Sequence, residues 1–418
     1  MSELRSGYRQ TEVGVIPEDW NAAKIADVGM LQTGPFGTVL KASEYSDDHG
    51  VPLISVGEIK LGKIVLRSDT PVVDGEVVRR LPRYLIREGD ILFGRKGGVD
   101  RSAPVSRRQD GWFLGSDGIR LRPRSEYTSQ FLAYQFQTQR IQHWLLENSV
   151  GTTMPSMNEA VLNQVSFPVP PTVQEQKAVV EALGDADALI EGLATLIAKK
   201  GDIKQGAMQE LLKSHRRLPG FTDNWQKVEL QSVATFRKGK GLAKGHIKED
   251  GTTKCIHYGE LFTKYGPVIG NIISRTHLSE GIVFSKRGDV LMPTSDVTPN
   301  GLATASCILE DGVILSGDTL IISPLPDVLV GAFLSNVIRL DHNQIMGLVS
   351  GSTVFHLYPS TMAKFSLKIP SACEQRAIAA VLSDMDAEIA ALEDRLAKAQ
   401  AVKLAMMQVL LTGEIRLI

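Results

Sequence analysis

The segment from Gly151 to Leu193 reads GTTMPSMNEAVLNQVSFPVPPTVQEQKAVVEALGDADALIEGL, and a second version, GSTVFHLYPSTMAKFSLKIPSACEQRAIAAVLSDMDAEIAAL, runs from Gly351 to Leu392. From the Glu-Gln dipeptide onward, the two copies are offset by a constant 199 residues. The same offset pairs Gly89-Asp90 with Gly288-Asp289 and Arg217-Leu218 with Arg416-Leu417. So many matches at one offset indicate a tandem repeat of about 200 residues.

Each repeat ends in the pattern of a long helix. Thr172 and Ser371 each precede a glutamate by three residues, the spacing of a capping box, in which the hydroxyl accepts from an amide and the glutamate reaches back to the cap. Apolar residues then recur at heptad spacing, which predicts that the two helices pair as an antiparallel coiled coil. The expected helical segments are 173–214 and 372–418, with the seam residues Leu183, Ile190, Ile197, Leu211, Leu382, Ile389, Leu396 and Leu410.

The remaining segments, 1–172 and 215–371, have the pattern of α+β globular domains. Short apolar runs such as VPLISV, GDILFG and DTLIIS are bounded by Gly, Pro and Asp, which indicates strands separated by turns. The run Ser129–Glu147 is helical in pattern, and VGAFLSNVIRLDHNQIM occupies the same place in the second repeat. Its aromatic residues follow the helical period, so we expect them in the core rather than on a base-stacking platform.

Charge is distributed unevenly, although the formal net charge is only −1. Residues 77–124 hold twelve Lys or Arg against five Asp or Glu, and residues 236–248 hold five basic residues and no acid. The helical segments 174–213 and 373–418 are each acidic by two charges. This alternation favours one surface for phosphates and another for protein, the alternative being an ordinary solvated face.

Several classes of protein and site are disfavoured. No stretch of the sequence has the pattern of a signal peptide or of a membrane span, and the three scattered cysteines form no metal or disulfide framework, so we expect buried, reduced thiols and a cytoplasmic location. No Walker A loop, methyltransferase motif or paired histidines point to catalysis or to a metal. Two Asp-x-Asp pairs, at 185–187 and 384–386, lie inside the heptad helices, which favours a structural or docking role over a metal site.

Two globular regions that end in a G-[TS]-T loop and a proline-flanked strand, each followed by an EQ-[KR] heptad helix, resemble the specificity subunit of type I restriction-modification enzymes. The resemblance covers essentially the whole chain and is closest over PVPPTVQEQKAVVEAL. KIPSACEQRAIAAVL has one proline where the family often has two, and GSTVFH departs from the G-T-T-x-P form of the first loop.

The resemblance implies that each globular region is a target recognition domain that reads one half of a bipartite, asymmetric sequence in double-stranded DNA. It also implies that the helices fix the unread spacer and dock two modification subunits, which restriction subunits join. The chain itself would be non-catalytic and would hold no cofactor, while S-adenosylmethionine and ATP with Mg²⁺ would bind the partner subunits. A multisubunit DNA methyltransferase without a nuclease partner is the alternative complex, and a coiled-coil scaffold without DNA contact is disfavoured by the basic stretches.

Basic residues in glycine-rich loops are the candidate DNA contacts, because Arg pairs with guanine, Lys or Arg takes phosphate, and glycine lets the backbone approach closely. The sequence leaves open which of them contact bases and which contact phosphates. Hydroxyl residues of the two G-[TS]-T loops are further candidates, with turn stabilisation as the alternative. The candidates are Arg95, Lys96, Arg101, Thr152 and Thr153 in the first repeat, and Arg237, Lys238, Lys240, Lys244, Ser352 and Thr353 in the second.

Overall fold

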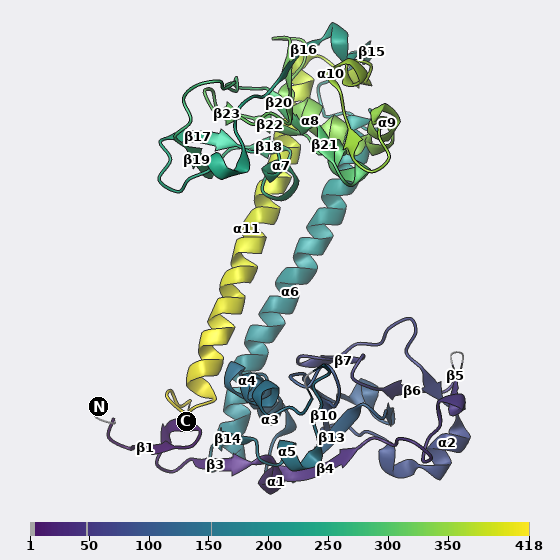
Figure 1. Cartoon of the computed structure of the whole chain (residues 1–418), viewed down its shortest axis with the longest axis vertical. Coiled ribbons are helices and arrows are strands. Elements are labelled where there is room, and N and C mark those ends of the chain that lie inside the picture. The colour runs from purple at the N-terminus through teal and green to yellow at the C-terminus, as the bar shows by residue number, and fades with distance from the viewer. Residues whose placement is uncertain (1–4, 47–48, 152, 418) are drawn as a thin grey trace. The chain divides into compact units, whose positions relative to one another are not determined.

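A computed structural model describes residues 5–46, 49–151 and 153–417. The chain divides into two compact units, of which unit 1 comprises residues 1–192 and 395–418 and unit 2 comprises residues 193–394. Two long helices, α6 (Val173–Leu212) and α11 (Ala372–Leu410), each contribute residues to both units (Figure 1). The units therefore divide the chain differently from the four expected segments, 1–172, 173–214, 215–371 and 372–418, because each helix is shared between the two units. Helix α11 ends eight residues before the end of the expected segment 372–418.

Unit 1 contains a four-stranded antiparallel sheet in the order β11-β10-β13-β4 and a second sheet in the order β12-β6-β9-β5. Strands β6 and β10 correspond to the apolar runs VPLISV and GDILFG. The elements are β1 (Tyr8–Thr11), β2 (Gly14–Pro17), β3 (Asn21–Lys24), α1 (Ile25–Val28), β4 (Gly29–Thr33), β5 (Tyr45–Ser46), β6 (Val51–Ile54), β7 (Ile59–Lys60), β8 (Lys63–Ile64), β9 (Val72–Val73), α2 (Gly75–Arg80), β10 (Ile91–Gly94), β11 (Ser102–Pro104), β12 (Phe113–Leu114), β13 (Gly118–Pro123), α3 (Ser129–Phe136), α4 (Gln139–Glu147), α5 (Glu159–Leu162) and β14 (Ser166–Val169).

Unit 2 repeats this arrangement with a five-stranded sheet in the order β16-β24-β20-β22-β18 and a smaller sheet in the order β19-β17-β23. The run DTLIIS lies in β24. The elements are β15 (Gln226–Glu229), β16 (Ala234–Lys238), β17 (Thr253–Ile256), α7 (Glu260–Thr263), β18 (Val268–Ile269), β19 (Ser274–Thr276), β20 (Val290–Pro293), β21 (Ser295–Asp296), β22 (Ser306–Ile308), β23 (Ile314–Leu315), β24 (Thr319–Pro324), α8 (Gly331–Leu340), α9 (His342–Leu348), β25 (Phe355–His356), α10 (Pro359–Met362) and β26 (Ser366–Ile369).

The central strands are apolar throughout because both of their faces are buried. Side chains alternate across a strand, and in β10 Ile91 and Phe93 join the core beneath the helices while Leu92 joins a second core with β6. In β20, Val290 and Met292 face one core and Leu291 the other. A strand covered on both sides loses the polar–apolar alternation of a half-exposed one, which explains the continuous apolar runs.

The helix expected over Ser129–Glu147 is two helices, α3 and α4. Thr138, between them, has an extended backbone (φ −68°, ψ 142°), and its hydroxyl donates to the carbonyl of Gln135 at 2.7 Å. The second unit breaks in the same place, at Asp341 between α8 and α9. The expected role of the aromatic residues is confirmed, because Phe131 and Phe136 are fully buried in the core.

The long helices pair antiparallel within each unit, which confirms the expected coiled coil. In unit 2, Lys200 contacts Glu388 at 2.7 Å and Lys204 contacts Asp386. Residue numbers therefore rise along α6 while those of the contacting residues fall along α11, as in an antiparallel pair. In unit 1, Leu183 packs with Leu410 in one core. The seam residues Leu183, Leu211, Leu382 and Leu410 are buried, and Ile190, Ile197, Ile389 and Leu396 are half-buried.

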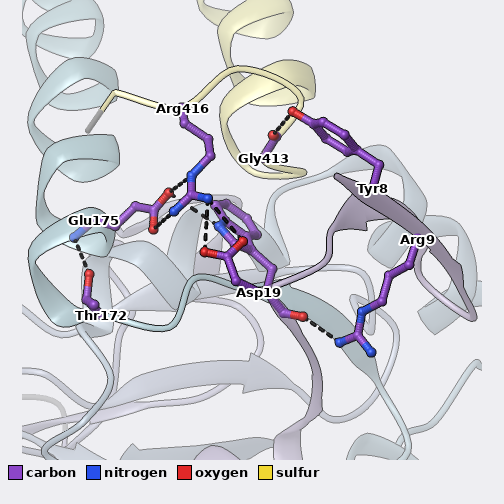
Figure 2. Close-up of polar contacts among 8 residues, drawn as sticks. Tyr8, Arg9, Asp19, Thr172, Glu175, Gly413 and Arg416 are labelled. Atoms are coloured by element: carbon purple, nitrogen blue, oxygen red, sulfur yellow. Dashed lines mark hydrogen bonds and ion pairs between the residues drawn. The ribbon is translucent and has the colours of Figure 1, made fainter. Parts of the chain in front are cut away.

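The glutamates of the two Glu-Gln dipeptides fix each helix start to its own unit, and Figure 2 shows the contacts of the first of them, Glu175. Glu175 accepts two hydrogen bonds from Arg416, at 2.7 and 2.9 Å, and Arg416 also contacts Asp19 at 2.9 Å. Glu374 receives Arg217 in the same way, at 2.6 and 2.7 Å. The arginine of the Arg-Leu pair that ends each repeat therefore binds the glutamate at the start of the other repeat's long helix.

The capping boxes differ from expectation in their second half. The Thr172 hydroxyl accepts from the amide of Glu175 at 3.2 Å, and the Ser371 hydroxyl accepts from that of Glu374 at 3.4 Å, as expected. The two carboxylates are instead engaged by the arginines, which form charge-assisted pairs stronger than a bond to a neutral amide. Within the part of the chain that the structure describes, no helix is apolar over a stretch long enough to cross a bilayer.

Candidate nucleic-acid interface

The basic loop of the first domain, residues 94–98, joins β10 to the segment that follows it. Gly97 adopts φ +77°, and a Cβ on Gly94 would lie 2.1 Å from the carbonyl oxygen of Gly98, so the tight turn depends on these glycines. The Gly97 amide donates to the Pro155 carbonyl at 2.8 Å, and the Met157 amide donates to the Arg95 carbonyl at 2.8 Å. The loop is therefore tied to the G-T-T loop, although about 60 residues separate them in the sequence.

Arg95 and Lys96 lie where four loops meet. The Arg95 guanidinium donates to the carbonyl of Ser116 at 3.1 Å and lies 5.1 Å from the ring centroid of Phe36, which is 58% exposed. Lys96 is exposed, with its Nζ 3.8 Å from Asp117. We call the surface formed by residues 34–37, 94–98, 115–117 and 153–157 the first loop face. Arg101 is half-buried, with its side chain close to Gly98.

The hydroxyl candidates occupy equivalent loops. Backbone pairs between Val150 and Ser156, at 2.8 and 2.9 Å, close the first loop, and pairs between Ser350 and His356, at 2.7 and 3.0 Å, close the second. Thr153 is exposed in the first of these loops. Ser352 and Thr353 are exposed in the second, and Thr152 lies outside the described residues.

The second domain builds the same face from residues 238–244, 294–297, 316–318 and 354–357, which we call the second loop face. The Thr294 amide donates to the Asp318 carbonyl at 2.9 Å, as the Arg95 amide donates to that of Asp117 at 2.8 Å. A Cβ on Gly239 would lie 1.9 Å from the Ser316 carbonyl, and one on Gly34 would lie 1.8 Å from that of Gly115. The basic residues of the two faces therefore lie on segments that are not equivalent: residues 94–98 in the first face and residues 238–244 in the second.

The four basic candidates of the second domain differ in how accessible their side chains are to DNA. Lys240 and Lys244 are exposed, and Lys238 is 57% exposed with its Nζ 3.7 Å from Asp318. Arg237 lies in β16 and donates to the buried carboxylate of Asp289 at 2.6 Å. Its guanidinium therefore stabilises the sheet and is the least available of the four for DNA.

Some of the arginines counted in the basic stretch 77–124 are likewise structural. Arg122 binds both oxygens of the buried Asp90, each at 2.7 Å, and this bond raises the pKa of Arg122. Burial lowers the pKa of Arg120, which donates to the carbonyls of Arg83 and Leu85. The repeated Gly-Asp dipeptides thus mark ion-pair positions in both sheets, which only the three-dimensional contacts reveal.

Thiols and acidic residues in the described part of the chain show no grouping of the kind that holds a metal. Over the described ranges, no three His, Cys, Asp or Glu side chains come together as such a group. Cys255 and Cys307 are buried, and burial raises their pKa values to about 11 and about 12. The expectation of buried thiols is wrong for Cys373, which is exposed on the first turn of α11.

Sequence comparison places both repeats in one family. A model of the family described as "Type I restriction modification DNA specificity domain" matches residues 17–199 and 222–401. A putative type I restriction enzyme MjaX specificity subunit from Methanocaldococcus jannaschii is 24% identical over 430 residues, covering 98% of this chain and 96% of the other. The EcoKI specificity subunit from Escherichia coli K12 is 27% identical over 236 residues, covering 54% of this chain and 48% of the other.

Solved structures share the fold. The type I restriction-modification S subunit from M. genitalium has a TM-score of 0.62 at 15% identity and covers 98% of both chains. A chain from a study of complex assembly and conformational transition in the type I R-M system has a TM-score of 0.55 at 16% identity, covering 96% of this chain and 99% of the other. These likenesses confirm the fold expected from the tandem repeat.

Proposed function

Because the chain belongs to the type I restriction-modification DNA specificity family, we propose that it reads DNA, each globular domain recognising one half of a bipartite, asymmetric sequence. The observation that carries the proposal is that each domain builds a loop face, and that the four loop segments of one face are equivalent to the four of the other. Lys96 and Lys240 on these faces are exposed, as phosphate contacts require. The faces share their backbone pairing and differ in their side chains, which suits two different half-sites.

The helices are the proposed docking surface for other subunits. Ile203 and Val402 hold the same position in the two repeats and are 47% and 56% exposed, outside the seam. Exposed apolar residues at matched positions suit a partner that binds twice, so we propose two modification subunits, which restriction subunits join. In this proposal the helix length sets the unread spacer, and S-adenosylmethionine and ATP with Mg²⁺ bind the partners. Since its ligand is DNA, the proposed location is the cytoplasm.

A domain exchange tests modular reading. The full chain, purified with its native partners, is offered a randomised duplex library, and we expect a motif of two half-sites with an unread gap. Residues 25–165 are then replaced by the equivalent segment of a relative, which leaves β3 and β14 paired, since Lys24 lies opposite Ser166. One half-site should change while the other stays. A motif altered in both halves, or in neither, would contradict the proposal.

Catalysis is tested separately. The chain freed of copurifying subunits should transfer no methyl group from labelled S-adenosylmethionine and should cleave no DNA. Turnover that persists after the partners are removed would show that the chain is itself an enzyme. Mass spectrometry of the native complex also separates a complete restriction enzyme from a methyltransferase that lacks a nuclease subunit.

A further inference from the structure

A cleft of about 300 Å³ lies at the border of the second loop face, and its lining includes Lys244 and Asp318 of that face together with His257 and Tyr258. We infer that this cleft receives the edge of a base pair in one half-site and that His257 is a specificity-determining residue there. This inference rests on the proposed function, and it assigns one reading position within it.

The local fold holds His257 in place. The residue follows directly after β17, and its amide donates to the carboxylate of Glu260 at 2.8 Å. The neighbouring Tyr258 amide donates to the Ser316 hydroxyl at 2.7 Å, and the rings of His257 and Tyr258 lie 4.6 Å apart. A side chain fixed by its own backbone contacts loses little conformational entropy on binding, which favours a reading role.

Hydrogen bonding also sets the tautomer of His257. Its Nδ1 accepts from the Gly259 amide at 3.2 Å, so the neutral ring carries its proton on Nε2. Burial lowers the pKa of His257 and keeps the ring neutral. The imidazole therefore offers one N–H donor, which suits an acceptor such as guanine O6 or N7.

The mixture of groups in the cleft favours a base over a phosphate. Lys244 and His257 supply donors, while Asp318 supplies an acceptor and a negative charge. A phosphate presents acceptors alone, and a carboxylate beside it is repulsive. Base edges in the major groove present both donors and acceptors, and a carboxylate accepts from cytosine N4. The cleft matches that mixed pattern.

The first domain carries different side chains at the same place. Ser55 follows β6 as His257 follows β17, and its amide donates to Glu58 at 3.1 Å, as that of His257 donates to Glu260. Both strands pair in parallel with an equivalent short strand, Ile54 opposite Leu114 and Ile256 opposite Leu315. Where the second domain has the imidazole of His257, the first has the small hydroxyl of Ser55. This difference gives the two domains different preferences, as an asymmetric sequence requires.

The test uses the full chain with its native partners and a randomised duplex library. His257→Ala should remove the preference at one or two base pairs of one half-site and weaken binding to the wild-type motif about tenfold, with the other half-site unchanged. His257→Gln, which keeps an N–H donor, should retain part of the preference. His215→Ala is the matched control, since its exposed ring lies beyond the end of α6 and outside the cleft.

Three outcomes would overturn the inference. An unchanged motif with unchanged affinity in His257→Ala would remove His257 from reading while leaving the proposed function intact. Equal weakening on all duplexes, with a shallower salt dependence, would assign the residue to the phosphate backbone. A wild-type complex that selects no sequence at all would overturn the proposed function and this inference with it.

Discussion

Lys403 Nζ lies 2.6 Å from Asp187 Oδ1, and 199 residues earlier Lys204 makes the same contact with Asp386. Both lysines stand at seam positions of their helices and are largely buried, with side chains 17% and 16% exposed. Asp187 also accepts the Tyr134 hydroxyl at 2.8 Å. A lysine ammonium buried in an apolar seam needs an anionic partner. The aspartate of the other helix lies within reach of that lysine in only one register, so the ion pairs favour the observed register of the two helices.

Lys403→Ala should therefore lower the free energy of unfolding by about 1 kcal/mol, because the seam loses both the packed stem of the lysine and its ion pair with Asp187, which keeps its hydrogen bond from Tyr134. Lys403→Met, which fills the seam with apolar atoms, should stay close to the wild type. Thermal unfolding of both variants is the measurement, with Lys199→Ala at an exposed position of α6 for comparison. Equal destabilisation by Ala and Met would mean that charge pairing, rather than packing, dominates at this position.

The sequence predicted the repeat and the helices well, since each rests on local periodicity. It missed the partners of Glu175 and Glu374, because Arg416 and Arg217 lie 241 and 157 residues away from them. The signal was present, since Arg217-Leu218 and Arg416-Leu417 are repeated at the same 199-residue offset as the glutamates. Only the fold brings the end of one repeat to the helix start of the other.

The loop faces were predicted in part. Arg95 and Lys96 lie on the first face, whereas their counterparts in the second domain are Thr294 and Ser295, which carry no charge. Local composition does not reveal which loops share a face, because strand pairing sets that. His257 was missed, although VPLISVGEIK and TKCIHYGELF are similar segments in which Ser55 aligns with His257.

Glu374→Ala should lower the free energy of unfolding of unit 2, because the substitution removes the buried carboxylate that binds Arg217 at the start of α11. The Glu374 side chain is 1% exposed and that of Arg217 is 25% exposed. Hydrogen exchange should rise first at the start of α11. Glu191→Ala, at an exposed position of α6, serves as the control and should change exchange little. Uniform protection in Glu374→Ala would refute this anchoring role.

Thiol labelling should distinguish the three cysteines. Burial raises the pKa values of Cys255 and Cys307 to about 11 and about 12, so their thiols stay protonated and unreactive at neutral pH. Cys373 is exposed. The native chain should take up one equivalent of a maleimide and the denatured chain three, with Cys373→Ser abolishing the fast reaction. Rapid modification of Cys307 in the native state would contradict the described core.

Removing charge from either loop face should weaken DNA binding and also flatten its salt dependence. Each phosphate contact releases counterions and contributes about −0.9 to the slope of log affinity against log salt concentration. Lys238→Ala with Lys240→Ala, or Arg95→Ala with Lys96→Ala, should make the slope shallower by about 1 to 2, less if a side chain contacts a base instead. The matched control removes two exposed charges from α6, Lys177 and Lys199, and should leave the slope unchanged. Titrations of the full complex at several salt concentrations give the slope directly. Wild-type slopes for both loop-face pairs, with a changed slope for the α6 pair, would move the phosphate-binding surface from the loop faces to the helices.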